Sequence, residues 1–403
     1  MLTQKTYNVL YLTMIAAFAI DCSSNGRSQD HLPCIDVEKN YPQKEVILTD
    51  IANITYVHLS TENSDYLFNG GIVCITENNI VVNDHSSGSI LFFSRNGNPK
   101  SRFNHVGNGP KEYSDRMFFI TYDETADDVF VNVPNFFSIL GQNSIPVYSS
   151  TGVYKRELIL PASPFPLVDF DDQSLFLYDM QNQRKKIFSK GMRSPTQSID
   201  SSYRRISKVD GKVLEYVDFP SDDNDLTNRG NGHREIIGYM RVVKCTEGLF
   251  LCNPETDTVF LYGKDKVLTP MVCKTPLVSK LDPVVVLMDF VDVGKYQFIQ
   301  TQTLANSDKM DYKGNLYKFY CLDKQTGEIF HSKINIPDYP TKDFFISAAN
   351  TYFDGKVTLA YFELDLIEIK QAYKENKLSG KLKELVATLK EDDNNVYVIA
   401  EFK

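Results

Sequence analysis

The sequence predicts an all-β protein, a six-bladed β-propeller with a short C-terminal amphipathic helix before its last strand. Two observations favour this fold. Short runs of β-branched and aromatic residues recur along the chain, and turn residues such as Asn, Asp and Gly separate them. The recurring units are roughly 40 to 70 residues long, which is the length expected of a four-stranded propeller blade.

The clearest unit lies between residues 70 and 105. Gly70-Gly71 precedes one predicted strand, Asn78-Asn79 precedes the next, and residues 86–88 precede a third. Asn96-Gly97 then predicts a hairpin with a type I′ turn, in which both central residues have positive φ. We therefore predict one antiparallel four-stranded sheet in this stretch.

Similar strand-turn-strand patterns follow along the rest of the chain, and we count about six units. A pair of β-sandwiches or an irregular β-helix would also use short strands, but the units recur in one orientation, which favours the propeller. The further strands are predicted at 129–131, 145–148, 154–160, 175–178, 249–251, 257–262, 295–299, 316–322, 328–336 and 356–362.

The two ends of the predicted propeller should meet. A ring that is not joined leaves sheet edges exposed, so the last blade must connect to the first. The predicted strands at 54–59 and 396–402 are the natural partners, and we expect them in one sheet or in two abutting blades. One helical region, 365–390, precedes the last strand, with Lys and Glu on its polar face. Its apolar stripe consists of Leu378, Leu382, Leu385, Val386 and Leu389.

The composition excludes some classes of protein. The chain has 403 residues and a formal net charge of -9, so a nucleic-acid partner, which needs a basic face, is not expected. Its seven cysteines include no C-x-x-C pair, which argues against a zinc site of that type. We expect free buried thiols, and Cys252 and Cys273 have the apolar neighbours typical of them. Pairing of some cysteines in an oxidising compartment is the alternative.

The first residues have the pattern of an export signal. Residues 9–20 form an apolar run that is too short to span a membrane but fits the central region of a signal peptide. Cys22 follows closely, as in a bacterial lipobox, although Asp21 replaces the small residue expected before it. We expect Cys22 to be lipidated. A plain signal, cleaved or uncleaved, and a buried structural helix are the alternatives.

The expected domain organisation has three parts. A lipoprotein-type signal peptide spans 1–21, a flexible tether spans 22–34, and a single propeller domain spans 35–403. The expected location is the cell envelope, with the protein periplasmic or surface-exposed and anchored to the outer membrane. The N-terminal lipid would be its single contact with the membrane.

Four features together resemble a known family. The lipoprotein-like start is followed by Ile35-Asp36 and residues 46–57, a G-x-G-P-x-E-Y loop spans 107–113, and D-T-V-F spans 257–260. The fourth feature is the tail of amphipathic helix, acidic turn and last strand, in which Asn394-Asn395 replaces the family's Asn-Pro. The chain resembles the six-bladed β-propeller lipoproteins of Bacteroides-type bacteria. This resemblance implies a propeller of the NHL or YWTD-like type and no settled activity, since these proteins are mostly of unknown function.

The motifs that we tested predict no catalytic residue, metal site or cofactor. Gly107-Asn108-Gly109 lacks the third glycine of a dinucleotide fingerprint, and Pro110 stands where a helix would begin. The acidic stretch at 222–234 has Asn228 and Arg234 where an EF-hand needs Gly and Glu. The sequence contains neither H-E-x-x-H nor G-x-S-x-G. A Ca²⁺ ion in the channel has no support in the sequence.

Glu112 and Tyr113 are the candidate ligand contacts. They follow Pro110 at the mouth of the glycine-containing loop. A structural role is the first interpretation of these two side chains, and ligand contact is the second.

The preferred hypothesis is a binding or scaffold module for a peptide, a glycan or an envelope protein. A rigid ring that carries variable loops suits this role. The alternative is a cation-dependent hydrolase or lyase with its site at the mouth of the channel, and a third hypothesis is a purely structural envelope protein. The lining of the channel should discriminate among them. Converging carboxylates would favour the enzyme, an apolar or Arg- and Tyr-lined funnel would favour binding, and a plugged channel would favour the structural role.

Overall fold

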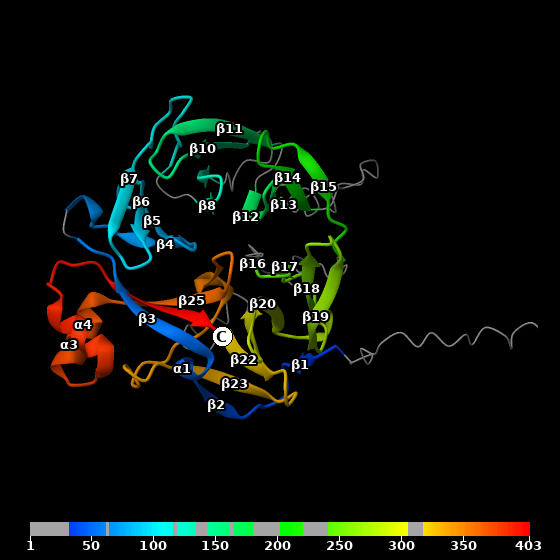
Figure 1. Cartoon of the computed structure of the whole chain (residues 1–403). Coiled ribbons are helices and arrows are strands. Elements are labelled where there is room, and N and C mark those ends of the chain that lie inside the picture. The colour runs from blue at the N-terminus through cyan, green and yellow to red at the C-terminus, as the bar shows by residue number, and fades with distance from the viewer. Residues whose placement is uncertain are drawn as a thin grey trace, which may run out of the picture. The chain divides into compact units, whose positions relative to one another are not determined.

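The structure, a computed structural model, describes residues 32–61, 64–115, 119–133, 143–160, 164–179, 202–220, 241–304 and 317–403. Within it, Pro33–Lys403 forms one compact unit. The described strands of this unit form six sheets, which follow one another around a common centre (Figure 1). The predicted six-bladed β-propeller is therefore confirmed.

Blades 1 to 3 each contain four antiparallel strands in sequence order. Blade 1 consists of β4 (Gly70–Ile75), β5 (Asn79–Asp84), β6 (Ser89–Ser94) and β7 (Pro99–Phe103). Blade 2 consists of β8 (Phe119–Asp123), β9 (Asp128–Asn132), β10 (Asn143–Tyr148) and β11 (Tyr154–Leu160). Blade 3 consists of β12 (Pro164–Asp171), β13 (Ser174–Asp179), β14 (Tyr203–Ser207) and β15 (Val213–Tyr216).

Blades 4 to 6 each include a strand from the N-terminal segment. Blade 4 consists of β16 (Arg241–Lys244), β17 (Gly248–Cys252), β18 (Thr258–Gly263), β19 (Leu268–Thr275) and β1 (Cys34–Asp36). Blade 5 consists of β20 (Val284–Val293), β21 (Tyr296–Leu304), β22 (Tyr317–Asp323), β23 (Ile329–Asn335) and β2 (Gln43–Ile47). Blade 6 consists of β24 (Thr351–Phe353), β25 (Thr358–Leu364), β26 (Val396–Phe402) and β3 (Ala52–His58).

The core of the propeller lies between the blades. Six clusters of buried apolar side chains each join two neighbouring blades, and one of them joins blade 6 to blade 1, so the core is continuous around the ring. The second strand of blades 1 to 4 is buried at every position. A strand with a covered blade on both faces needs apolar residues in succession, which explains runs such as Leu175–Tyr178 in the sequence.

The ring closes as predicted. The C-terminal strand β26 pairs antiparallel with the N-terminal strand β3, with Val396 opposite His58 and Phe402 opposite Ala52. Both strands belong to blade 6, so the first and last strands of the ring share one sheet. The closing strand β3 is the outermost strand of that blade.

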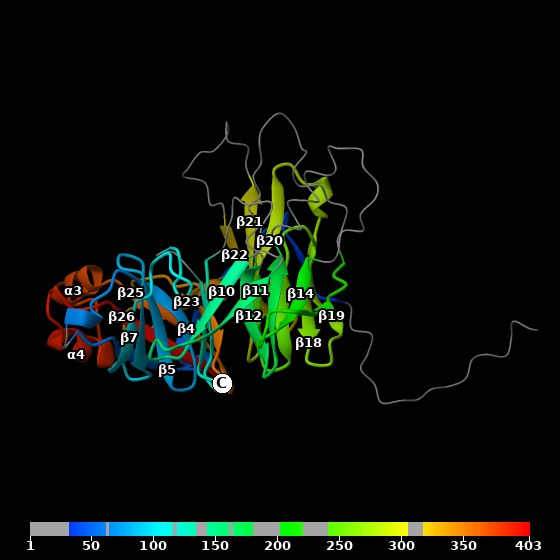
Figure 2. The ribbon, with the colours of Figure 1, turned by 90° about the horizontal axis from the view of Figure 1, so that it is seen from above.

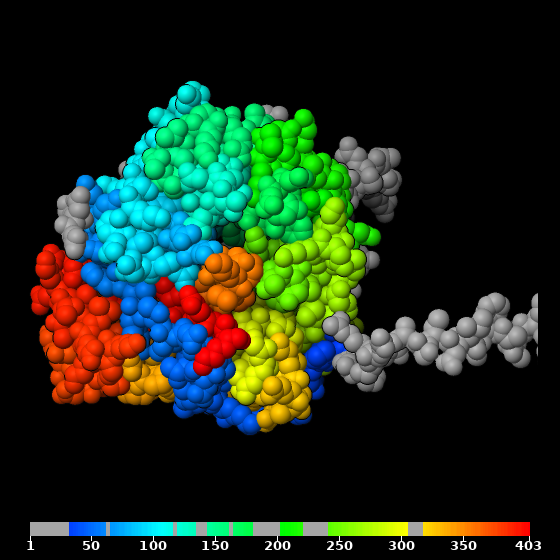
Figure 3. Space-filling view, viewed as in Figure 1, coloured from blue at the N-terminus to red at the C-terminus, as the bar shows by residue number. Residues whose placement is uncertain are grey.

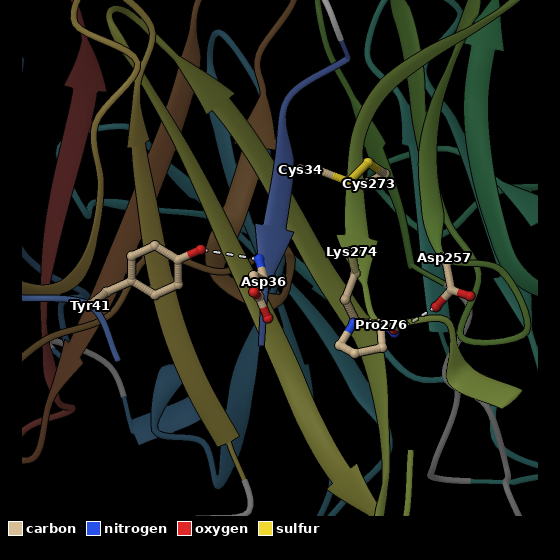
Figure 4. Close-up of a disulfide and its surroundings, with 7 residues drawn as sticks. All are labelled: Cys34, Asp36, Tyr41, Asp257, Cys273, Lys274 and Pro276. Carbon is tan, nitrogen blue, oxygen red and sulfur yellow. Dashed lines mark hydrogen bonds and ion pairs between the residues drawn. A yellow bond between two sulfur atoms is a disulfide. The ribbon is translucent and has the colours of Figure 1, made fainter. Parts of the chain in front are cut away.

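The N-terminal segment also covers the outer edges of two other blades. Strand β1 pairs in parallel with β19, and β2 pairs in parallel with β23. A disulfide between Cys34 and Cys273 joins β1 to blade 4 (Figure 4). The expectation of a free thiol was wrong for Cys273, because β1 brings a second cysteine beside it, from 239 residues away in the sequence. Free thiols remain at Cys74, Cys245, Cys252 and Cys321.

The hairpin predicted at Asn96-Gly97 is present, but its turn type was wrong. Gly97 has a φ of 87°, whereas Asn96 is not among the residues with positive φ, so the turn is not type I′. The Gly97 N–H donates to the Ser94 carbonyl, and the Ser94 N–H donates to the Asn98 carbonyl. A type I turn followed by one residue in the left-handed region forms such a three-residue loop.

Gly97 lies directly against the closing strand, and this contact predicts a difference between two glycines. A Cβ added at Gly97 would lie 2.0 Å from the His58 carbonyl oxygen, while one added at Gly327, φ 72°, would meet nothing within 4 Å. Gly327→Ala should lower the free energy of unfolding by about 1 kcal/mol, the cost of a left-handed alanine. Gly97→Ala should lose roughly 1–2 kcal/mol more, because backbone of β3 must also shift. If urea unfolding showed equal losses of free energy for Gly97→Ala and Gly327→Ala, the close contact between Gly97 and His58 would be contradicted.

The tail contains two helices where we predicted one helical region. Helix α3 (Leu366–Lys374) and helix α4 (Gly380–Thr388) are separate because Asn376 and Gly380 both have positive φ. Asp365 caps α3 by accepting a hydrogen bond from the Glu368 N–H. The predicted apolar stripe does face the core, since Leu378, Leu382 and Val386 are buried in the cluster between blades 5 and 6. A short helix, α1 (Leu48–Ile51), links β2 to β3.

Candidate functional site

The candidate site begins where an apolar row of blade 5 gives way to a polar one. Val291, Phe298 and Cys321 lie opposite one another on β20, β21 and β22, and all three pack in the core between blades 5 and 6. The parallel row two residues further along the same strands consists of Asp289, Gln300 and Phe319. Side chains two apart on a strand share a face, so this row continues the same surface of blade 5. All three of its side chains line a pocket.

A β-bulge in β20 shapes this row. The register of β20 against β21 shifts between Leu287 and Asp289, which leaves Met288 as the extra residue. Adjacent residues of a regular strand point to opposite faces. Met288 and Asp289 nevertheless both line the pocket, which is the kind of re-aimed side chain that a bulge produces.

Other blades supply the remaining walls. Arg241, the first residue of β16, comes from blade 4, while Phe345, Ser347 and Ala349 come from the segment that leads into β24. Tyr317, at the start of β22, completes the lining. The pocket has a volume of about 290 Å³. Figure 2 shows β20 and β21 extending beyond the neighbouring blades on one side of the ring.

Aromatic side chains form the apolar part of the pocket. The rings of Phe319 and Phe345 are stacked, with centroids 4.1 Å apart and planes 21° from parallel. Phe345 is nevertheless 38% exposed and Tyr317 is 44% exposed. Large aromatic side chains exposed beside a pocket are available for contact with a ligand.

Asp289 is a carboxylate in an apolar setting. It is 3% exposed, and the backbone N–H groups of Phe290 and Ala348 donate hydrogen bonds to it. Burial raises the pKa of Asp289 from 3.8 to about 6, although Arg241 and the two backbone donors oppose the shift. Such a position destabilises the ionised side chain, and perturbed carboxyl groups of this kind are enriched at functional sites.

The raised pKa of Asp289 predicts a pH-dependent stability. The folded protein holds this proton more tightly than the unfolded chain, so the stability that it contributes is present below about pH 4 and is lost as the pH rises to about 6. Asp289→Asn cannot titrate. Relative to the wild type, it should gain about 2–3 kcal/mol in free energy of unfolding between pH 4 and pH 7.5, at about 1.4 kcal/mol per pKa unit.

Urea unfolding at the two pH values measures this difference. Asp172→Asn, at an exposed turn position, serves as the control and should show no such gain. A wild type and an Asp289→Asn variant with the same pH profile would contradict the assignment.

A second charged cluster, which is already paired, joins the first strands of blades 2, 3 and 4 to Lys208, the residue after β14. Lys208 lies 2.5 Å from Asp123 and 2.6 Å from Asp169, and Lys244 lies 2.5 Å from Asp169. Burial alone would lower the pKa of Lys208, but Asp169 and Asp123 reverse this effect and hold its pKa above the usual value. These pairs join blades 2, 3 and 4, and we interpret them as structural.

The centre of the ring is narrow. Around it, β24 of blade 6 contacts β4, and the first strands then contact one another in succession from β4 to β20. Strand β16 of blade 4 also contacts β24. Figure 3 shows a small hollow at the centre of one face. Among the residues that the structure describes, no three His, Cys, Asp or Glu side chains are grouped so that they could hold a metal ion.

The predicted site residues do not line this pocket. Tyr113 is 2% exposed, its hydroxyl donates to the Gly88 carbonyl, and the His105 N–H donates to that hydroxyl. Glu112 accepts a hydrogen bond from the Gly109 N–H within its own loop. Contact of either residue with a ligand stays a prediction. Cys22 and the acidic stretch at 222–234 lie outside the described residues.

Sequence reasoning missed the pocket because its residues come from three blades. The local signal is Asp289 between Met288 and Phe290, a charged residue inside an apolar strand. Its partners Gln300 and Phe319 can be identified only once the register of three strands is known. No helix in the described part of the chain is long and apolar enough to cross a membrane.

The comparison with protein families agrees with this fold. Residues 23–219 match DUF5128, a family described as "6-bladed beta-propeller". This part of the chain is similar to DUF5128. The sequence of the propeller matches no curated protein at a significant level.

One solved structure supports the same fold. An exported protein of Bacteroides fragilis, so described in its name, is 14% identical, with a TM-score of 0.57 over 92% of this chain and 99% of its own. A DUF4221 member from Bacteroides vulgatus is 11% identical, with a TM-score of 0.45 over 88% of this chain and 97% of its own. Virginiamycin B lyase from Staphylococcus aureus is 14% identical, with a TM-score of 0.36 over 76% of this chain and 94% of its own. At 14% identity, the likeness to the Bacteroides fragilis protein concerns the fold.

Proposed function

We propose that this propeller is a binding module that takes part of a peptide, a glycan or an envelope protein into the pocket between blades 4, 5 and 6. The row Asp289, Gln300 and Phe319 carries the proposal, because it places polar and aromatic side chains where the neighbouring row is apolar and packed. A mostly formed pocket with aromatic walls and a few converging polar groups is typical of ligand sites. A buried carboxylate lowers the stability of the fold, and a role in ligand binding would explain why this position has one.

We also propose that the protein is exported and lipid-anchored. Disulfides are typical of proteins in an oxidising compartment, and this chain has the disulfide Cys34–Cys273. The apolar run before Cys22 and the name of the similar Bacteroides fragilis protein support the same location. The proposed anchor is a lipid on Cys22, which would hold the propeller at the outer membrane, on its periplasmic or outer side.

A variant that fills the pocket tests the binding function. Ala349 is an exposed residue of the pocket lining, so Ala349→Phe should fill space without removing any side chain that packs in the core. Ala387→Phe, at an exposed position of α4, is the matched control. Similar thermal unfolding of the two variants would show that both are folded.

The measurement is saturation-transfer NMR with a library of short peptides and oligosaccharides. At least one library member should receive saturation both from the wild type and from Ala387→Phe. The members that do so should receive none from Ala349→Phe. Undiminished transfer in Ala349→Phe would place binding elsewhere. The absence of transfer from the whole library would count against a binding module of this kind.

A further inference from the structure

The chemistry of the pocket narrows its ligand to one class. We infer that the pocket takes a single ring of a neutral saccharide, with the ring face against Phe345 and its hydroxyl groups toward Asp289 and Arg241. The inference rests on the proposed binding function and specifies its ligand. Size, charge and the arrangement of polar and aromatic groups each contribute to it.

The size of the pocket limits what it can hold. Its volume of about 290 Å³ lies at the lower end of the range for small-molecule sites. One six-membered ring with its substituents suits such a volume, whereas a longer stretch of a polymer must remain outside. We therefore expect the pocket to hold one residue of an oligosaccharide.

The charges in the pocket favour a neutral ligand. Asp289 and Arg241 have opposite charges and line the same small volume. Once Asp289 is ionised, a cationic or an anionic ligand meets one like and one opposite charge there, so neither gains a net attraction that would repay its desolvation. A neutral ligand with several hydroxyl groups can donate to the carboxylate and accept from the guanidinium at the same time.

The remaining polar groups match hydroxyl chemistry. Gln300 lies opposite Asp289 in the strand register, and its amide offers both donors and an acceptor beside the carboxylate. Ser347 also lines the pocket, and its hydroxyl, which already bonds Asn350 in a capping box, keeps one acceptor position. A saccharide ring presents several neighbouring hydroxyl groups that act as both donors and acceptors, so it can satisfy this mixed set.

The aromatic groups match the other face of a sugar ring. Phe345 is 38% exposed, and the ring of Phe319, which also lines the pocket, stacks on it with the centroids 4.1 Å apart. A ring held in place by a stacked neighbour is a flat surface with little freedom to lose on binding. The C–H groups on one face of a pyranose carry a small positive charge and can lie against the negative face of such a ring.

A peptide is the competing ligand, and the pocket fits it less well. Peptides often bind by adding a strand to a free sheet edge, where backbone hydrogen bonds supply the affinity. The polar groups that line this pocket are side chains, and its central carboxylate lies beside an arginine. A single charged peptide side chain would meet one like and one opposite charge there, so it would gain little from the pair.

The test compares matched sugars on the full chain. Isothermal titration or ligand-observed NMR would be run with neutral hexoses, N-acetylhexosamines and their disaccharides, and with galacturonic acid and glucosamine as the charged counterparts. We expect binding of at least one neutral sugar at millimolar concentration and binding of its charged counterparts about tenfold weaker or not at all. Phe345→Ala should weaken the neutral sugar about tenfold. Phe119→Ala, at an exposed aromatic of blade 2, should leave the affinity unchanged.

The outcomes separate this inference from the proposed function. A peptide that binds and is displaced in Ala349→Phe, with no neutral sugar bound, would overturn the saccharide assignment and leave the pocket as the binding site. A charged sugar that binds as tightly as its neutral counterpart would also overturn it. A sugar whose affinity is unaffected by Ala349→Phe would overturn both the assignment and the proposed pocket.

Discussion

Replacing Lys274 with Met is expected to lower the free energy of unfolding by about 3–5 kcal/mol, because it leaves a buried carboxylate without its partner. The Lys274 side chain is fully buried, and its Nζ lies 2.6 Å from Asp257 Oδ1 and donates to the Pro276 carbonyl at 2.7 Å. Asp257 also accepts from the Val278 N–H, which begins the short 3₁₀ helix η2 (Val278–Lys280) between blades 4 and 5. The pair therefore ties the end of blade 4 to the start of blade 5 (Figure 4).

Urea unfolding measured by circular dichroism under non-reducing conditions would quantify the loss. Lys333→Met is the matched control, since Lys333 forms a 2.6 Å pair with Asp343 and both side chains are more than a third exposed. Exposed pairs contribute at most about 1 kcal/mol, so the control should lose little. The double variant Lys274→Met/Asp257→Asn should recover part of the loss, because no uncompensated charge remains. Equal losses in Lys274→Met and Lys333→Met would show that burial of this pair has no energetic consequence.

Removal of the disulfide is the second change with a large expected effect. Cys34 and Cys273 are 239 residues apart in the sequence, so their bond closes a very long loop and restricts the unfolded chain. The double variant Cys34→Ser/Cys273→Ser should lose about 3–5 kcal/mol in free energy of unfolding, since the effect increases with the length of the closed loop. A reducing agent should lower the stability of the wild type by a similar amount and leave that of the variant unchanged.

The loss of the disulfide should also have a local signature. Strand β1 has three residues. Just before it, the Pro33 carbonyl accepts from the Cys273 N–H, and just after it, the Val37 N–H donates to the Thr275 carbonyl. Hydrogen exchange at Val37 and Cys273 should accelerate in the double variant. Exchange in β3, which is held by its pairing with β26, should not change. Faster exchange in β3 as well would mean that the disulfide stabilises the closure of the ring itself.

Much of the fold could be predicted because its signals are local. Short apolar runs such as 80–82, separated by turn residues, mark each blade, and the same pattern repeats around the ring. The closing partners were predicted because the ends of a ring have few other places to pair, and β3 and β26 do pair. The type of the turn at Gly97 and the break in the tail helix were not predicted, since Gly and Asn permit more than one backbone conformation.

The candidate site depended on tertiary structure. Asp289, Gln300 and Phe319 become neighbours through strand register and a bulge at Met288, and neither leaves a periodic signal in the sequence. The parallel strands β1 and β2 and the Cys34–Cys273 bond likewise join segments more than 200 residues apart.

The sequence by itself determined the class of fold, the number of blades and the strands that close the ring, because short apolar runs and turn residues act over a few residues. The tertiary structure alone decided which polar side chains meet, because contacts between distant segments depend on how the blades pack. The pocket between blades 4, 5 and 6 is one result: the pairing of β20, β21 and β22 places a carboxylate, an amide and an aromatic ring in one row.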